Sequence, residues 1–118
     1  MKNDMSYLKE MPIAVLGGGA VGKTVAADCK LAGREVRLYS RSEKSIAGLE
    51  KSGILLDGVQ HSLYGFERSG KAYMDVVSTD MEKVVKGAGL IIISIPAHGH
   101  EHYLKTLVPL LEDGQVIH

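Results

Sequence analysis

Cysteine is nearly absent from this sequence of 118 residues, and its absence excludes two kinds of chemistry. Cys29 is the only cysteine, so no disulfide can form within the chain, which fits a reducing compartment. No motif places a base beside this thiol, and a lone cysteine on an apolar helix face is usually a small core residue. We therefore predict a packing role for Cys29 rather than a nucleophilic one.

The sequence also lacks an excess of charge and any long apolar run. Lysine plus arginine and aspartate plus glutamate number 14 each, so no net field would attract nucleic acid or an anionic membrane. Residues 1–10 contain no apolar signal-peptide core, and the longest apolar run is far shorter than the roughly 20 residues that span a bilayer. We expect a cytoplasmic protein that binds neither nucleic acid nor membrane.

Clustered metal ligands are lacking as well, although three histidines alternate near the end of the chain. His98, His100 and His102 follow Pro96, where a strand should end and a helix begin. On a helix His100 would be separated from the other two, and no cluster of cysteines or carboxylates accompanies them. The sequence therefore predicts no metal site.

Glycine, by contrast, is concentrated in one informative motif. The stretch Gly17-Gly18-Gly19-Ala20-Val21-Gly22-Lys23-Thr24 fits both the dinucleotide pattern G-x-G-x-x-G and the P-loop pattern G-x-x-x-x-G-K-[ST]. Both patterns aim the positive N-terminus of a helix at a phosphate group. Phosphate binding follows from either pattern, so the surroundings of the motif must decide between them.

These surroundings favour the dinucleotide pattern. A P-loop site usually needs an aspartate at the end of an apolar strand to hold Mg²⁺, whereas Asp80 lies where a helix should begin. A strand over 13–16, a helix over 20–32 and a second strand over 35–39 instead supply the context of a dinucleotide turn. A P-loop nucleotide hydrolase stays as an alternative, which Mg²⁺-dependent binding of ATP or GTP would support.

Each residue of the dinucleotide turn has an expected role. Gly17 makes the tight turn, Gly19 lets the pyrophosphate approach the backbone, and Gly22 lets the helix pack closely on the strand. The main-chain N–H groups around Ala20 and Val21 open the helix and face the phosphates. These five residues are the predicted pyrophosphate contacts.

The residues after the second strand indicate which dinucleotide is bound. NAD sites usually have an aspartate or glutamate here, about 20 residues past the glycines, which accepts hydrogen bonds from the ribose 2′-hydroxyl. This sequence has Ser40-Arg41-Ser42, followed by Lys44. A guanidinium group and hydroxyl donors can bind the 2′-phosphate of NADP. Ser40 and Arg41 are therefore predicted contacts of the adenosine ribose, and NADP is favoured over NAD.

The other end of the cofactor crevice should lie after the strand over 90–95. Ligands of open α/β sheets bind beyond the carboxyl ends of the strands. Ile95, Pro96 and His98 are therefore predicted to line the nicotinamide side. A packed or solvated histidine at the start of a helix is the alternative for His98.

The order of the remaining elements predicts an α/β fold. Beyond residue 39 the patterns indicate a helix over 42–52, a β-hairpin over 54–71, a strand over 73–78, a helix over 79–87 that opens with a Thr79–Glu82 capping box, a strand over 90–95, a helix over 99–111 that Pro109 bends, and the start of a strand at 115–118. We predict a flexible extension over residues 1–10 and one domain over 11–118. Its fold is a Rossmann-like, doubly wound parallel sheet with helices on both faces and a small inserted β-hairpin.

Several segments together resemble one enzyme family. The run 13–22, the Ser78-Thr79-Asp80 step, the run 92–97 with His100-Glu101 after it, and the run 109–115 resemble the cofactor domain of the opine dehydrogenases, such as octopine and nopaline dehydrogenases. The same domain of glycerol-3-phosphate dehydrogenase and ketopantoate reductase is similar, less closely. The resemblance implies that an amino acid and a 2-oxo acid are condensed reductively, with hydride from NAD(P)H.

The resemblance also implies that the catalytic histidine and the amino-acid site belong to a second, helical domain that this sequence does not contain. We therefore predict the NAD(P)-binding domain of an opine dehydrogenase-like oxidoreductase, truncated here, with no catalytic residue of its own and no turnover by itself. Its partners would be the two substrates, through the missing domain, and a homodimer is left open. The alternative is a stand-alone module that senses NAD(P) and never transfers hydride.

Overall fold

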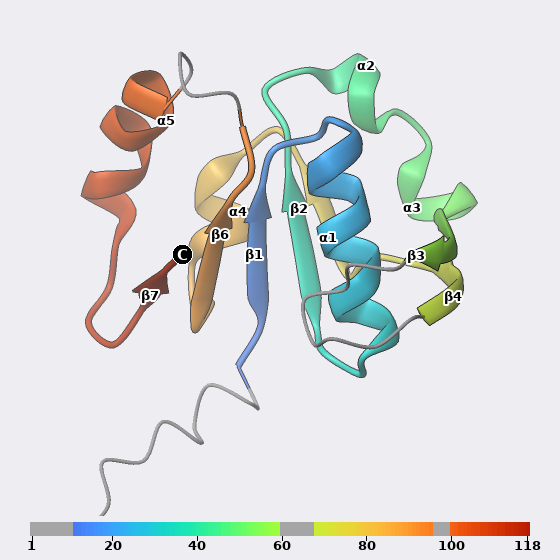
Figure 1. Ribbon diagram of the computed structural model, residues 1–118. Helices are drawn as coiled ribbons and strands as arrows, with labels where there is room; N and C mark the ends of the chain where they lie inside the picture. The colour runs from blue at the N-terminus through green and yellow to red at the C-terminus, as the bar shows by residue number, and fades with distance from the viewer. Residues whose placement is uncertain (1–10, 60–67, 96–99) are drawn as a thin grey trace, which may run out of the picture.

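The computed structural model describes residues 11–59, 68–95 and 100–118, which form a parallel five-stranded sheet with helices on both faces (Figure 1). The strand order is β5-β2-β1-β6-β7. In chain order the elements are β1 (Ile13–Leu16), α1 (Ala20–Leu31), β2 (Val36–Tyr39), α2 (Glu43–Ile46), α3 (Leu49–Ser52), β3 (Ile54–Val59), β4 (Arg68–Ala72), β5 (Val76–Ser78), α4 (Met81–Val85), β6 (Leu90–Ile93), α5 (His100–Leu107), the 3-10 helix η3 (Val108–Leu110) and β7 (Val116–Ile117). The predicted Rossmann-like fold is confirmed.

Strand β1 lies at the centre of the sheet because all its side chains are apolar and fully buried. Ile13 and Val15 pack in the core that α1 covers, whereas Ala14 and Leu16 pack in the core of α4 and α5. Successive side chains of a strand point to opposite faces, so such a strand needs cover on both sides. β2 and β6 pair with β1 in parallel, and the carboxyl ends of the three strands therefore meet at one edge.

Small residues let α1 lie close to the sheet. Ala26, Ala27 and Cys29 are all fully buried on its inner face. The predicted packing position of Cys29 is confirmed. On the opposite face, α4 and α5 bury Val84 and Leu107 against the sheet.

The predicted hairpin is present as a separate, antiparallel two-stranded sheet made of β3 and β4. It packs beside α1, and it buries Ile54, Leu56 and Ala72 in the core that α1 also covers. The insertion thus adds cover to the α1 face and leaves the strand order of the main sheet unchanged.

The single helix predicted over 42–52 is wrong, because the structure has two short helices, α2 and α3, in its place. Gly48 lies between them in the left-handed conformation, with φ of 73°. Glycine adopts this conformation without a steric penalty, so the chain can turn sharply there. The apolar spacing of Ile46 and Leu49 is compatible with both arrangements, and it did not reveal the break.

Other boundaries also differ from prediction. The strand predicted over 73–78 begins at Val76, and the strand predicted over 90–95 ends at Ile93. Helix α4 is capped by Asp80 rather than by Thr79, since the Asp80 carboxylate accepts a hydrogen bond from the Glu82 N–H at 3.1 Å.

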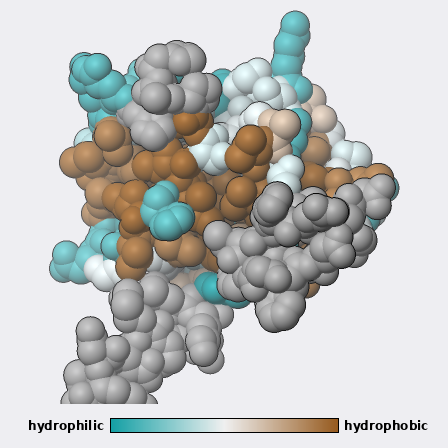
Figure 2. Space-filling view, in the orientation of Figure 1, coloured by the Kyte–Doolittle hydropathy of each residue, from teal (hydrophilic) through white to brown (hydrophobic). Residues whose placement is uncertain are grey.

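Apolar surface is exposed between α1 and α5, on the side of the sheet edge formed by β6 and β7 (Figures 1 and 2). The elements that border this area carry exposed apolar side chains, which are Val21, Leu104, Val108 and Ile117. Within the described residues, no helix has the length and apolarity needed to cross a membrane.

Candidate functional site

The glycine turn lies at the edge of the sheet where β1, β2 and β6 end. The N–H of Gly17 donates a hydrogen bond to the Tyr39 carbonyl at 2.8 Å, and the N–H of Ser94 donates to the Leu16 carbonyl at 2.9 Å. These bonds join the residue after β1 to the end of β2, and the residue after β6 to the end of β1. The crevice predicted at the carboxyl ends of the strands is therefore built from segments far apart in the sequence.

Gly17 and Gly22 are required by the fold itself. Gly17 has a φ of 137°, and a Cβ at this position would lie 2.0 Å from the Ser94 carbonyl oxygen. A Cβ on Gly22, in the first turn of α1, would lie 2.0 Å from the Gly17 carbonyl oxygen. The tight turn and the close contact between helix and strand are thus both present.

Gly19 differs, because nothing within the described residues requires it to be glycine. Its φ of −78° and ψ of −174° suit any residue, and a Cβ there would meet no heavy atom within 4 Å. Gly19 is the N-cap of α1, and within the part of the chain that the structure describes no side chain caps this end of the helix. The open space in front of Gly19 fits a backbone that a ligand approaches closely.

A pocket of about 650 Å³ opens in front of this helix end. Its lining comes from the start of α1 and the end of β6, and consists of Gly19, Ala20, Val21, Gly22, Ile93, Ser94 and Ile95. None of these residues is acidic, and the first turn of α1 contains no carboxylate. The positive end of the helix dipole therefore faces the pocket without a competing negative charge, which suits a pyrophosphate group.

The P-loop alternative does not fit this geometry. Helix α1 begins at Ala20, ahead of Gly22, so no loop remains that could surround a phosphate group. The hydroxyl of Thr24 donates a hydrogen bond to the Ala20 carbonyl at 2.8 Å. In a P-loop this hydroxyl would hold Mg²⁺. The turn therefore has the geometry of the dinucleotide motif.

The turn after β2 lies beside the glycine turn. The Ser40 hydroxyl accepts a hydrogen bond from the Ser42 N–H at 3.1 Å and donates one to the Ser42 carbonyl at 3.2 Å. Ser40 is only 4% exposed, and a Cβ on Gly18 would lie 2.6 Å from its hydroxyl oxygen. Ser40 thus shapes the turn, whereas the Arg41 side chain is exposed to solvent.

Two tyrosines below this turn belong to the same region, although the sequence did not point to them. Tyr39 ends β2 and Tyr103 lies on α5, and their rings meet edge to face with centroids 5.6 Å apart. Tyr39 is 7% exposed and Tyr103 is 5% exposed. No local pattern connects residues so far apart in the chain, so only the tertiary fold reveals the pair.

Charges at the carboxyl edge act on both tyrosine hydroxyls. Burial raises the pKa of Tyr39, the positive charge of Arg41 lowers it, and the negative charge of Asp80 raises it, with a net rise. Burial also raises the pKa of Tyr103, as does the neighbouring Tyr39, and the positive charge of Arg41 offsets only part of this rise.

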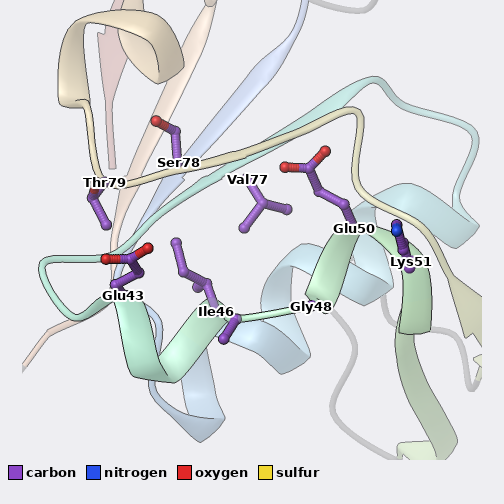
Figure 3. A pocket seen from close by; sticks show the side chains of 9 residues that line it. Glu43, Ile46, Gly48, Glu50, Lys51, Val77, Ser78 and Thr79 are labelled. Carbon is purple, nitrogen blue, oxygen red and sulfur yellow. The ribbon is translucent and has the colours of Figure 1, made fainter.

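A second pocket, of about 550 Å³, lies between β5 and the helices α2 and α3 (Figure 3). Ile46 and Val77 project into it, and the carboxylates of Glu43 and Glu50 lie at its margins. Among the described residues, Lys51 is the one basic residue that lines it. Two carboxylates against one ammonium group disfavour a phosphate ligand. The pocket at α1 is therefore the better site for a pyrophosphate.

The remaining predicted contacts are only partly described. Ile95 lines the pocket at α1, and its predicted place beside the nicotinamide stays a prediction, whereas Pro96 and His98 lie outside the described residues. His102 is exposed on α5, with its ring centroid 6.4 Å from that of Tyr103. Over 11–59, 68–95 and 100–118, no three histidine, cysteine or acidic residues come together in a group that could hold a metal ion.

Comparison with known sequences identifies the family. The sequence model described as the N-terminus of NAD-dependent glycerol-3-phosphate dehydrogenase matches residues 12–118. The chain belongs to this family. Among its relatives, the glycerol-3-phosphate dehydrogenase (NAD(P)+) of Moorella thermoacetica is 30% identical over 107 residues, which cover 89% of this chain and 29% of the relative.

Solved structures share the fold of this family member. Octopine dehydrogenase with NADH and L-arginine has a TM-score of 0.72 and 23% identity, over 91% of this chain and 27% of that one. Ketopantoate reductase from Ralstonia eutropha JMP134 has a TM-score of 0.72 and 22% identity, over 91% and 33%. The resemblance to these enzymes is confirmed. Glycerol-3-phosphate dehydrogenase, similar less closely in the sequence motifs, is the one that gives the family its name.

The chain spans less than a third of the length of the relatives that it matches first. The matched part is the NAD(P)-binding N-terminal domain of a dehydrogenase family. Membership in the family therefore shows that this chain is an NAD(P)-binding domain. It does not by itself show which reaction a whole enzyme would catalyse.

Proposed function

We propose that this chain binds NADPH in preference to NADH and serves as the cofactor domain of a dehydrogenase. The observation that carries the proposal is the contrast among the glycines of the turn. Gly17 and Gly22 must be glycine because a Cβ at either position would clash with other atoms of the chain. At Gly19 a Cβ would clash with nothing, and this residue lines an open pocket. A glycine that the fold does not require is expected where a bound pyrophosphate approaches the backbone closely, because a side chain there would block the ligand.

The chain would bind and orient the dinucleotide. Main-chain N–H groups at the start of α1 would bind the pyrophosphate, and the α1 dipole would stabilise its charge. Ile93 and Ile95 give the neighbouring part of the pocket apolar walls, which exclude water. When bound, the nicotinamide ring supplies the hydride chemistry.

Arg41 supports the preference for NADPH. Its side chain is exposed at the end of β2, and residues 40–42 contain no carboxylate. A guanidinium group can bind a 2′-phosphate through two parallel hydrogen bonds. The 2′-hydroxyl of NADH would find no carboxylate acceptor in this turn.

For the complete enzyme, two substrate classes have support. The relatives are named glycerol-3-phosphate dehydrogenases, which favours hydride exchange between a phosphorylated alcohol and its ketone. The motifs shared with opine dehydrogenases favour hydride transfer to an imine of an amino acid and a 2-oxo acid. The full-length gene product should be assayed with dihydroxyacetone phosphate and, separately, with pyruvate plus amino acids. Oxidation of NADPH with only one set assigns the class.

Gly19→Ala tests the pyrophosphate site. The added methyl group meets no atom of the described chain, so the melting temperature should stay close to that of the native protein. The methyl group would stand in front of the helix end, so NADPH affinity in a calorimetric titration should fall by about tenfold or more. Gly22→Ala is the matched control, since it should instead lower the melting temperature. Undiminished binding by Gly19→Ala would place the pyrophosphate elsewhere.

Arg41→Ala tests the choice of cofactor. It removes the guanidinium group but leaves the turn, whose internal hydrogen bonds involve Ser40 and Ser42. NADPH affinity should fall by about tenfold or more, since charge-assisted bonds to the 2′-phosphate are lost, and NADH affinity should change little. Mg·ATP serves as a third ligand. Equal losses for NADPH and NADH would refute the preference, and a folded native protein that binds neither would refute the cofactor role.

A further inference from the structure

Gly18 is not among the predicted cofactor contacts, but it lies against the turn after β2. It is buried, whereas the adjacent Gly19 is exposed. We propose that Gly18 is a positioning residue for cofactor selection, which sets the distance between the glycine turn and the turn that carries Arg41. This inference rests on the proposed function, because it concerns the same cofactor site.

The side chain of Ser40 leaves no room for a methyl group on Gly18. A Cβ on Gly18 would lie 2.6 Å from both the Cβ and the hydroxyl oxygen of Ser40, and 3.4 Å from the Cβ of Ser45. Carbon atoms that are not bonded to each other pack at about 3.5–4.0 Å. The glycine turn and the turn after β2 therefore lie as close together as a residue without a side chain allows.

Ser40 cannot make room without moving the turn after β2, because its Cβ is attached directly to the main chain. Its hydroxyl accepts a hydrogen bond from the Ser42 N–H at 3.1 Å and donates one to the Ser42 carbonyl at 3.2 Å. Its own N–H donates to the Ser78 carbonyl at 3.2 Å. A substituent on Gly18 would thus displace Ser40 together with Arg41, which follows it directly.

The distance between the two turns matters because one cofactor molecule would bind both of them. The pyrophosphate would bind at the start of α1 and the 2′-phosphate at Arg41, and the covalent structure of the dinucleotide limits how far apart these groups can lie. NADH would make the same pyrophosphate contact, but it has no 2′-phosphate for Arg41 to bind. A displaced turn after β2 should therefore weaken NADPH binding more than NADH binding.

Gly18→Ala tests the proposal. In calorimetric titrations NADPH affinity should fall about tenfold, and NADH affinity should fall by less than about threefold. The melting temperature is recorded beside the affinities, because the added methyl group can also strain the fold. Val84→Ala, which removes buried methyl groups from α4 on the other face of the sheet, is the control. It should lower the melting temperature and leave the NADPH to NADH affinity ratio unchanged.

A second substitution separates positioning from general strain. Ser40→Gly removes both atoms that the added methyl group would meet at 2.6 Å. By itself Ser40→Gly should weaken NADPH binding, because the hydrogen bonds with Ser42 are lost. In a protein that already carries Ser40→Gly, however, Gly18→Ala should lower the NADPH to NADH affinity ratio no further. An undiminished effect of Gly18→Ala in this background would overturn the proposal.

A measurement on the native protein avoids any effect of substitution on folding. The α-protons of Gly18 and the β-protons of Ser40 should show a nuclear Overhauser effect, because the two residues are in contact. Its absence would overturn the proposal, as would equal losses of NADPH and NADH affinity in Gly18→Ala. If the native protein prefers NADPH and Gly18→Ala keeps that preference, only this inference fails. If the native protein binds neither dinucleotide, or prefers NADH, the proposed function fails as well.

Discussion

Individual residues in this domain can be separated into two kinds by the atoms that surround them. Residues of the first kind contact other parts of the chain and maintain the fold, and residues of the second kind are left open to a ligand. Asp75 is a residue of the first kind. Its carboxylate accepts hydrogen bonds from the Val36 N–H and from the Lys30 ammonium group, both at 2.8 Å. It thereby ties the end of α1 and the start of β2 to the segment before β5. Gly19 and Arg41 are proposed to be of the second kind, because a Cβ on Gly19 would meet no atom within 4 Å and the Arg41 side chain is exposed.

Stability should depend on pH through Asp75. Burial raises its pKa, but the hydrogen bonds from Lys30 and from Val36 and the Lys30 charge outweigh burial, so the pKa lies below its usual 3.8. The folded state thus favours the charged form, and the stabilisation is present above about pH 4 and is lost as the pH falls through the lowered pKa.

Asp75→Ala should therefore lower the free energy of unfolding at pH 7 by about 1–2 kcal/mol, mostly because the Val36 N–H loses its acceptor. The ion pair adds little, since its side chains are 30% and 35% exposed and solvent screens them. Urea unfolding at pH 7 and pH 3 measures the effect, which should shrink at pH 3. Asp113→Ala, in an exposed turn, is the control. A difference that is the same at both pH values would contradict this account.

Short elements in this fold depend on side chains that join them. Helix α4 has five residues, too few to be stable in isolation. The Gln115 amide donates hydrogen bonds to the Val85 and Ala88 carbonyls, both at 2.9 Å, and its oxygen accepts one from the Glu112 N–H at 2.7 Å. Gln115 thus ties the end of α4 to the residue before β7.

Gln115→Leu should cost about 1–3 kcal/mol of unfolding free energy, because partly buried carbonyl groups at the end of α4 lose their donor. Chemical denaturation measures this loss. Lys105→Ala, which breaks only the exposed Lys105–Glu101 pair on α5, is the control and should cost less than about 0.5 kcal/mol. Equal costs for the two variants would show that the bridge does not stabilise α4.

The molecule as a whole has two unequal sides. The α1 side of β1 and β2 is covered by a helix and by the inserted hairpin, whereas apolar surface remains between α1 and α5 (Figure 2). Exposed apolar surface of this kind often marks an interface. A homodimer is therefore a proposal that the 118-residue chain itself can test.

We expect the 118-residue chain to associate reversibly as its concentration rises, in sedimentation experiments. Val108→Lys should raise the dissociation constant about tenfold, since it places a charge on η3 beside the exposed Leu104 of α5. Leu55→Lys, at an exposed leucine of the hairpin, is the control and should leave association unchanged. A chain that is monomeric at every concentration, or that responds equally to both substitutions, would refute this interface.

Features that depend on residues close together in the sequence could be predicted from the sequence. The spacing of Gly17, Gly19 and Gly22 indicated the dinucleotide turn, and the apolar run over 90–93 indicated a buried parallel strand. Local conformational preference and the alternation of side chains are sufficient for such features. The choice between NADP and NAD stays a prediction that rests on Ser40 and Arg41.

Features that depend on distant residues needed the tertiary structure. The sequence by itself determined that a glycine turn would open a helix toward a phosphate, because adjacent residues set that geometry. Only the fold decided that Gly22 lies against Gly17 while Gly19 borders open space, and that the rings of Tyr39 and Tyr103 meet. The physical reason is that steric contacts and hydrogen bonds depend on distances in space, and the parallel sheet brings the ends of β1, β2 and β6 together only when the whole chain has folded.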